Sequence, residues 1–222
     1  MSGVPDRAPP AGATVHLVRH GMHDWLLPGR NRLAGRLPGV HLNRQGREEA
    51  ERLAARLRGE PLAWVASSPL ERTLETAEII ARPHGLAVVP DPRLLEWAFG
   101  PWEGMEIDAI RRADPRRWEL WRQAPDLFSL AGAETLQEVA ERMEAAYREW
   151  AGRGGVGVMV SHQDPLAALL CRLVGAPLRA MRALEVPTGA LATCRETPWG
   201  TVLVRLNPGF PTSVETWKVE GK

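Results

Sequence analysis

The chain has 222 residues, which suffices for one large domain or two small ones. Hydrophobic residues make up 44% and charged residues 25%, as in ordinary globular proteins. The 28 basic and 27 acidic side chains leave a net charge of +1, which argues against binding nucleic acid or a membrane surface through bulk charge. No stretch approaches the ~20 apolar residues of a membrane span, and Cys171 and Cys194 are too few for a disulfide scaffold.

Residues 1–13 are rich in Pro, Gly and Ala and lack the apolar core of a signal peptide. We expect them to form a disordered lead-in. Neither a repeat nor a linker divides the remainder, so residues 14–222 are predicted to form a single domain. Because the sequence shows no apolar signal core and too few cysteines for a disulfide scaffold, we expect a cytoplasmic location.

Short apolar runs with β-branched residues predict buried strands. These runs lie at residues 14–18, 62–66, 86–89, 155–160, 190–194 and 201–206. Amphipathic helices are predicted at residues 45–57, 69–81, 134–150 and 165–173, with Asp164 placed to cap the last one. Two long stretches, residues 26–42 and 96–133, interrupt this alternation of strands and helices and are predicted to be loops. The second contains a weak helix at about residues 105–113.

Alternating strands and helices predict an α/β fold with helices on both faces of the sheet. The expected architecture is a three-layer α/β/α sandwich around a mixed, mostly parallel sheet. Only a short turn at residues 197–200 separates the last two strands, which predicts an antiparallel hairpin there.

Polar side chains follow several predicted strands. Arg19 and His20 follow the first, Arg72 lies about one helical turn beyond the second, Glu96 comes after the third, and His162 follows the fourth. Ligands of open α/β sheets bind at the carboxyl ends of the strands, so we expect these side chains at one edge.

This set of side chains favours the binding of a phosphate group. Guanidinium forks of Arg19 and Arg72 match phosphate oxygens, and nearby helix N-termini add N–H donors. A neutral His20 would be a nucleophile, and Glu96 is the best-placed acid for the leaving oxygen. The arginines could instead pair with carboxylates such as Glu96, and Glu103 competes for the role of acid.

Six runs of sequence resemble, in this order, the motifs of the histidine phosphatase superfamily, also called phosphoglycerate mutase-like. They are Leu17-Val18-Arg19-His20-Gly21 and the runs at residues 35–40, 42–46, 67–77, 95–104 and 160–162. The resemblance extends from about residue 15 to residue 206. It implies that His20 becomes a phosphohistidine, that Arg19, Arg72 and His162 hold the phosphoryl oxygens, and that Glu96 donates a proton. No metal and no cofactor are implied.

The resemblance also implies phosphate or substrate contacts for Gly21, His23, Gly35 and Gln163. Two departures leave the substrate open. Met22-His23 stands where the family often has a hydroxyl residue, and Gln163 stands where many members have Gly.

The run from Phe99 to Gly104 resembles the phosphatase branch of the family. We therefore expect a phosphomonoester hydrolase that acts on a small phosphorylated metabolite, with phosphoglycerate mutase as the alternative. A homodimer is possible by analogy. Arg30, Arg32 and Arg36 suggest an acidic or multiply phosphorylated substrate, or merely a solvated surface.

Other interpretations of these residues remain. A metal-dependent hydrolase could use His20, His23 and Asp24, but it leaves Arg19 and Arg72 unexplained. A non-catalytic phosphate-binding module would not need the acid. Outside the site we expect His16 to be structural, the tryptophans of the long loop to pack, and the remaining histidines, His23 among them, to lie in loops or at the solvent.

Overall fold

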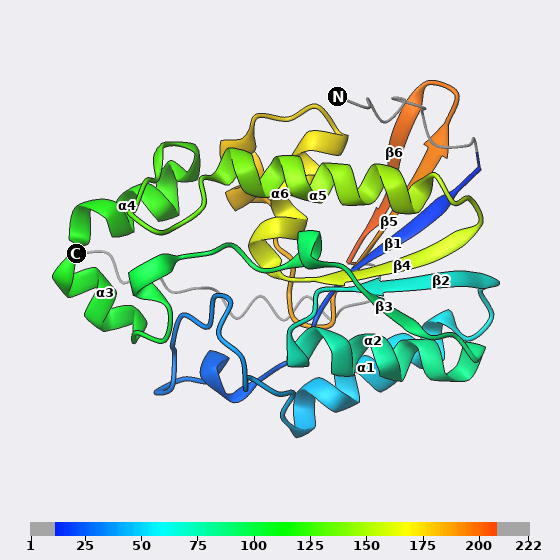
Figure 1. Ribbon diagram of the computed structural model, residues 1–222, viewed down its shortest axis with the longest axis horizontal. Coiled ribbons are helices and arrows are strands. Elements are labelled where there is room, and N and C mark those ends of the chain that lie inside the picture. Colours follow the sequence, from blue (N-terminus) through cyan, green and yellow to red (C-terminus); the bar gives the residue numbers. More distant parts are fainter. Residues whose placement is uncertain (1–11, 208–222) are drawn as a thin grey trace.

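The computed structural model describes residues 12–207 (Figure 1). Residues 1–11 and 208–222 lie outside the described residues. They include most of the predicted lead-in and the end of the predicted domain, so the division of the chain at residue 13 stays a prediction. No helix within residues 12–207 is long and apolar enough to cross a membrane.

The described chain is built around a six-stranded sheet in the order β3-β2-β4-β1-β5-β6. The strands are β1 (Thr14–Arg19), β2 (Leu62–Ser67), β3 (Val88–Pro90), β4 (Val156–Ser161), β5 (Leu191–Thr197) and β6 (Gly200–Leu206). β4 runs parallel to β1 and β2, and β3 runs parallel to β2. β5 is antiparallel to β1 and forms the predicted hairpin with β6. The mixed, mostly parallel sheet is confirmed.

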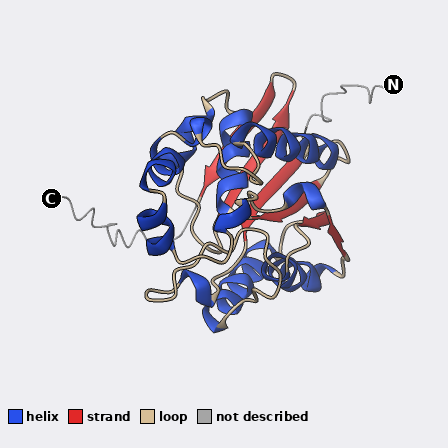
Figure 2. Ribbon diagram, turned by 60° about the vertical axis from the view of Figure 1, so that its left-hand side comes forward, coloured by secondary structure: helices blue, strands red, loops and turns tan. Residues whose placement is uncertain are grey.

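Helices cover both faces of the sheet, which completes the three-layer sandwich (Figures 1 and 2). α1 (Arg44–Leu57) and α2 (Glu71–Ala81) pack on one face, and α5 (Leu136–Ala151) and α6 (Gln163–Leu173) on the other. Each face has its own buried cluster. One cluster contains Leu53 and Ile80 of α1 and α2, and the other contains Met143 and Leu169 of α5 and α6.

The long stretch after β3 is more regular than its sequence suggests. It contains α3 (Ile107–Ala113), where a weak helix was predicted, and α4 (Pro115–Gln123), where none was. Pro115 occupies the first turn of α4, and the Asp114 side chain accepts a hydrogen bond from the Arg117 amide. Together, proline and cap begin a helix whose apolar pattern is weak. Trp121 packs edge-on against Phe99 at 5.5 Å between ring centroids, so packing is confirmed for this tryptophan.

The four predicted helices begin one or two residues earlier or later than expected, and two of these shifts concern the site. α2 starts at Glu71 rather than at residue 69, so Arg72 lies in its first turn. α6 starts at Gln163, with His162 as its N-cap residue. The capping role expected of Asp164 is wrong, because its carboxylate lies within the first turn and accepts hydrogen bonds from Arg182 at 2.7 and 3.4 Å.

A close backbone crossing holds the segment that follows β1. The Asn43 amide donates to the Met22 carbonyl at 3.0 Å, and the Asn43 side chain caps α1 at the Gly46 amide. A Cβ at Gly46 would lie 2.1 Å from the Met22 carbonyl oxygen, and one at Gly21 would lie 2.3 Å from the Gly46 oxygen. Only glycines allow α1 to approach the end of β1 this closely.

Replacing Gly46 by Ala is expected to lower the free energy of unfolding by about 1–3 kcal/mol, because the new methyl group meets backbone that cannot turn aside. Urea unfolding followed by circular dichroism measures this difference. Gly59→Ala is the matched control, since no heavy atom of the described residues, apart from its own chain neighbours, lies within 4 Å of its Cβ position. Equal stability of the two variants would contradict the crossing.

Candidate active site

His20 lies directly after β1 and is only 2% exposed. Its amide donates to the Ser161 carbonyl, and its carbonyl accepts from the Gly189 amide, both at 3.1 Å. Its Nδ1 lies 2.8 Å from the Gly21 carbonyl oxygen. Because a carbonyl only accepts, Nδ1 carries the proton and Nε2 keeps a lone pair. The backbone therefore selects the tautomer that a nucleophile needs.

Both backbone groups of Gly21 are used within the chain. Its carbonyl accepts from His20, and its amide donates to the Thr76 hydroxyl at 3.1 Å. The Gly21 carbonyl thus orients the His20 imidazole.

Two further imidazoles surround His20. The ring centroid of His162 lies 5.2 Å away in an edge-on arrangement, and that of His23 lies 5.3 Å away. His162 Nε2 is 3.0 Å from the Ser68 hydroxyl. His23 lies in the loop after β1, one of its two expected places, but it is 2% exposed and therefore not at the solvent.

Burial and positive charge keep these rings neutral. Burial, and then the charges of Arg72 and Arg19, hold the pKa of His20 well below its usual value. Burial and Arg72 have the same effect on the pKa of His162, and burial and the two arginines lower the pKa of His23 to about 3. At neutral pH His20 therefore holds an unprotonated Nε2.

The guanidinium charges of Arg19 and Arg72 both act on His20. Arg19 Nη1 donates to the Gln163 side-chain oxygen at 2.6 Å and to the Val186 carbonyl at 2.7 Å. Arg72 is 1% exposed and donates from Nη2 to the Gly35 carbonyl at 2.8 Å. Burial lowers the pKa of Arg72 to about 10, so it remains charged at pH 7.

Buried nitrogens of four of these side chains have no hydrogen-bond partner within the described chain. They are Arg19 Nε, Arg72 Nε and Nη1, His23 Nδ1 and His162 Nδ1. An unpartnered buried polar group costs about 1–3 kcal/mol. Such groups gathered around His20 constitute an arrangement suited to the oxygens of a tetrahedral anion.

Glu96 reaches the same group of side chains from the segment after β3. Its Oε1 accepts from the Trp97 amide at 2.8 Å, and its Oε2 lies 4.0 Å from His162 Nδ1. Burial, followed by the charge of Asp164, raises the pKa of Glu96 to about 7. This carboxyl can therefore give up or take a proton near neutral pH.

Glu103 is oriented differently. Its Oε1 accepts from the Phe99 amide at 3.0 Å, and its side chain packs where a Cβ of Gly35 would lie, 2.6 Å away. The φ angle of +50° at Gly35 is a further reason for glycine there. Of the two candidate acids, it is Glu96 that faces His162.

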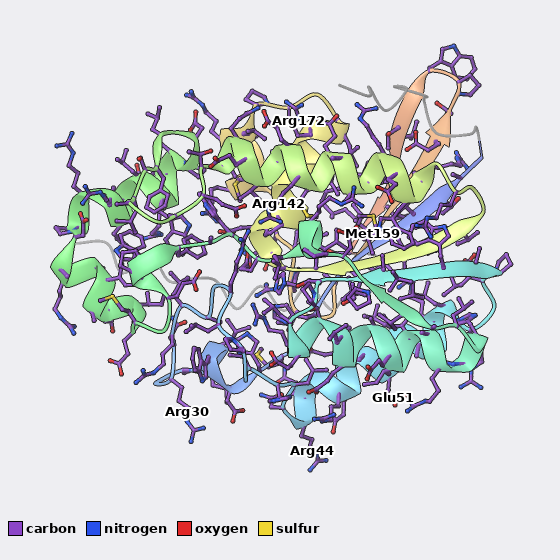
Figure 3. All side chains as sticks on the ribbon, in the orientation of Figure 1. Arg30, Arg44, Glu51, Arg142, Met159 and Arg172 are labelled. Carbon is purple, nitrogen blue, oxygen red and sulfur yellow. The ribbon has the colours of Figure 1, made fainter. Side chains whose placement is uncertain are left out.

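The arginines of the long loop after β1 are paired within the chain. Arg30 bonds Asp24 at 3.4 Å, Arg32 bonds Glu106 at 3.1 Å, and Arg36 bonds Glu134 at 2.5 Å. Figure 3 shows Arg30 projecting away from the body of the molecule, whereas Arg142 points inward beneath α5. Sequence analysis missed Arg142, whose only sequence signal is a charge beside the apolar stripe of a predicted helix.

The sequence profile of the histidine phosphatase superfamily (branch 1) matches residues 15–208. The chain belongs to this superfamily. It is 30% identical over 196 residues to Phosphoserine phosphatase 1 of Hydrogenobacter thermophilus, with 86% of this chain and 90% of that protein covered. It is 33% identical over 193 residues to the Probable phosphoglycerate mutase GpmB of Yersinia pestis, with 83% and 86% covered.

Solved structures of superfamily proteins have the same architecture. Bacillus stearothermophilus YhfR matches with a TM-score of 0.81 and 28% identity, over 86% of this chain and 95% of its own. A putative alpha-ribazole-5'-P phosphatase from Escherichia coli matches with a TM-score of 0.79 and 27% identity, over 88% and 96%. The fold is thus shared with a solved structure named as an alpha-ribazole-5'-P phosphatase.

Inorganic phosphate or vanadate is expected to stabilise the protein, because its oxygens would satisfy the unpartnered nitrogens around His20. At a concentration 100 times the Kd the gain is about 2.7 kcal/mol. The measurement is thermal unfolding as a function of anion concentration. Arg72→Met should lose this gain, and the exposed control Arg82→Met should keep it. An undiminished gain in Arg72→Met would contradict the assignment.

Proposed function

We propose that this protein hydrolyses phosphomonoesters of a small metabolite through a phosphohistidine at His20, without a metal ion. The observation that supports this most is the lone pair on His20 Nε2 beside the unpartnered nitrogens of Arg19, Arg72 and His162. A nucleophile and a convergent set of anion donors are what phosphoryl transfer requires.

In the first step His20 Nε2 attacks phosphorus, a P–N bond forms, and the ester P–O bond breaks. Arg19, Arg72 and His162 stabilise the charge on the phosphoryl oxygens. Protonated Glu96 gives its proton to the leaving oxygen, so the product departs as an alcohol. Glu96 is then a carboxylate.

In the second step a water molecule attacks the phosphohistidine. Glu96 takes a proton from this water as the new P–O bond forms, and the P–N bond breaks. Nε2 recovers its electron pair, and inorganic phosphate leaves. One carboxyl group thus acts first as acid and then as base, for which a pKa of about 7 is well suited.

The positive charges of Arg19 and Arg72 also supply what a metal ion would supply elsewhere, and they repel a cation. The rival arrangement of His20, His23 and Asp24 does not converge, since Asp24 is exposed and bonds Arg30 and Asn43. Within residues 12–207 no group of at least three His, Cys, Asp or Glu side chains is arranged to hold a metal.

Phosphatase is favoured over mutase by the loop arginines. A phosphoglycerate mutase must hold a carboxylate in addition to the phosphoryl group, whereas Arg30, Arg32 and Arg36 are all engaged by acidic side chains of the chain itself. The mutase stays the second candidate, supported by the name of the Yersinia pestis relative. We propose that His23 and Gln163 contact the phosphate or the substrate; a homodimer and a cytoplasmic location stay predictions.

His20→Ala is expected to lose turnover of p-nitrophenyl phosphate by more than about 10³-fold while it keeps the fold, because the ring supplies chemistry rather than packing. The assay runs at pH 5 to 8 with EDTA present, beside the wild type, and circular dichroism checks the fold. Activity that EDTA removes from the wild type would refute the metal-free mechanism. Residual turnover near the wild-type rate would refute the role of His20.

The pH dependence should identify Glu96 as the acid. Its raised pKa means that the proton is present below about pH 7 and lost above it. The kcat/KM of the wild type for an alkyl phosphate should therefore fall about tenfold per pH unit above pH 7. Glu96→Gln should be slower by about 10²–10⁴-fold and lack this decline. A decline that survives in Glu96→Gln would assign it to another group.

A further inference from the structure

We propose that Arg36 is a positioning residue for Glu96, acting through the main chain of residue 96 from the loop between β1 and α1. This rests on the proposed function, in which Glu96 is the proton donor. Arg36 touches no reacting atom; its effect would pass through the backbone that carries the acid.

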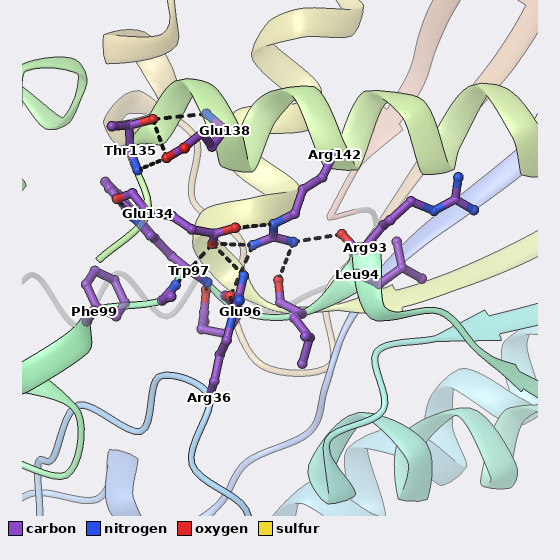
Figure 4. Close-up of polar contacts among 12 residues, drawn as sticks. Arg36, Arg93, Leu94, Glu96, Trp97, Phe99, Glu134, Thr135, Glu138 and Arg142 are labelled. Carbon is purple, nitrogen blue, oxygen red and sulfur yellow. Dashed lines mark hydrogen bonds and ion pairs between the residues drawn. The ribbon is translucent and has the colours of Figure 1, made fainter. Parts of the chain in front are cut away.

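Arg36 links three parts of the fold (Figure 4). Its Nε donates to the carbonyl oxygen of Glu96 at 2.8 Å, and its Nη2 donates to the Glu134 carboxylate at 2.5 Å. The same carboxylate accepts from the Ala98 amide at 3.2 Å. The guanidinium group therefore fixes the backbone before Trp97 directly, at the Glu96 carbonyl. It fixes the backbone after Trp97 through Glu134, which accepts from the Ala98 amide.

Arg142 holds the same segment from α5. It donates to the carbonyls of Arg93 and Leu95 at 2.7 Å and to the carbonyl of Glu96 at 3.0 Å. It also bonds Glu134 at 2.9 Å. Although burial alone would raise it, the hydrogen bonds from Arg142 hold the pKa of Glu134 below its usual range, so this carboxylate keeps its charge between the two arginines.

The two arginines differ in what their loss would do. Arg142 holds three carbonyls within residues 93–96 and its side chain is 15% exposed, so its removal would disturb folding. Arg36 makes one bond to the carbonyl of residue 96, which Arg142 also holds, and one to Glu134. Without Arg36 the segment keeps its supports on Arg142, and the freedom gained lies at residue 96 and, through Glu134, at Ala98.

Such freedom matters because the Glu96 carboxylate has a single hydrogen-bond partner among residues 12–207. Oε1 is held by the Trp97 amide, and Oε2 extends to 4.0 Å from His162 Nδ1. A displacement of about 1 Å in a reacting group can cost about 10²-fold in rate. The other arginines of the loop lack this role, because Arg30 and Arg32 pair with exposed carboxylates.

Leaving-group dependence separates positioning from a structural effect. p-Nitrophenolate leaves without a proton, whereas the alkoxide of glycerol 2-phosphate needs one. Arg36→Met should lower kcat/KM for glycerol 2-phosphate by about 10–10²-fold and change that for p-nitrophenyl phosphate by less than about threefold, because the acid assists only the poor leaving group. Arg36→Lys, which can keep one of the two bonds, should lie in between.

The control substitution is Arg148→Met, which removes an exposed ion pair with Glu144 on α5 and should leave both rates unchanged. Glu96→Gln should show the same selective loss as Arg36→Met. The double variant should be no slower than Glu96→Gln alone, since a misplaced acid and a missing acid cost the same step.

Equal losses on both substrates in Arg36→Met and Arg36→Lys, or additive losses in the double variant, would overturn the proposal. A selective loss in Glu96→Gln alone would overturn the role of Arg36 and leave the proposed function standing. If Glu96→Gln treats the two substrates alike, the acid itself is misassigned and the role of Arg36 falls with it.

Discussion

The site depends on two guanidinium groups, those of Arg19 and Arg72, which bond only neutral oxygens in the described chain. Positive charge held in a buried place disfavours further protonation nearby, so the surrounding imidazoles remain neutral. The proton on Glu96 has a separate cause, because the burial of this carboxyl and the charge of Asp164 raise its pKa to about 7 although both arginines lower it. The two guanidinium charges thus account for a free nucleophile and an affinity for anions, and burial accounts for the available acid.

Much of this arrangement is readable from the sequence. Apolar runs define the strands, and the carboxyl ends of parallel strands meet at one edge of a sheet. The sequence alone therefore predicts that Arg19, His20, Arg72 and His162 lie close together. The sequence motifs around these residues, in their order along the chain, further support this placement. Glu96 was harder to place, because it lies on irregular chain whose position is set by tertiary hydrogen bonds rather than by a local pattern.

Other features depend on contacts between distant residues and leave no local signal. The crossing at Gly21 and Gly46 needs the backbones of β1 and α1 to be in place. His23 is buried with its ring beside that of His20, and its polar loop sequence gives no sign of this burial. α4 forms through a proline and a cap in spite of a weak apolar pattern. The inward turn of Arg142 is likewise a property of the packed molecule.

The relatives with different named substrates are similar to this chain across its whole described core. The chemistry that they share would reside at the strand ends, and differences among substrates would reside in the long loops. In this chain the loop after β1 is tied to the acid-bearing segment through Arg36 and Glu134. Substrate choice and acid catalysis are therefore expected to be coupled.

Trapping the covalent intermediate tests the central claim most directly. Brief reaction with a ³²P-labelled phosphomonoester, a denaturing quench at alkaline pH and peptide mapping would locate the label. The account predicts an acid-labile, base-stable phosphoryl group on the peptide that contains His20, and none in His20→Ala. A label on another residue, or steady turnover in His20→Ala with no label, would contradict it.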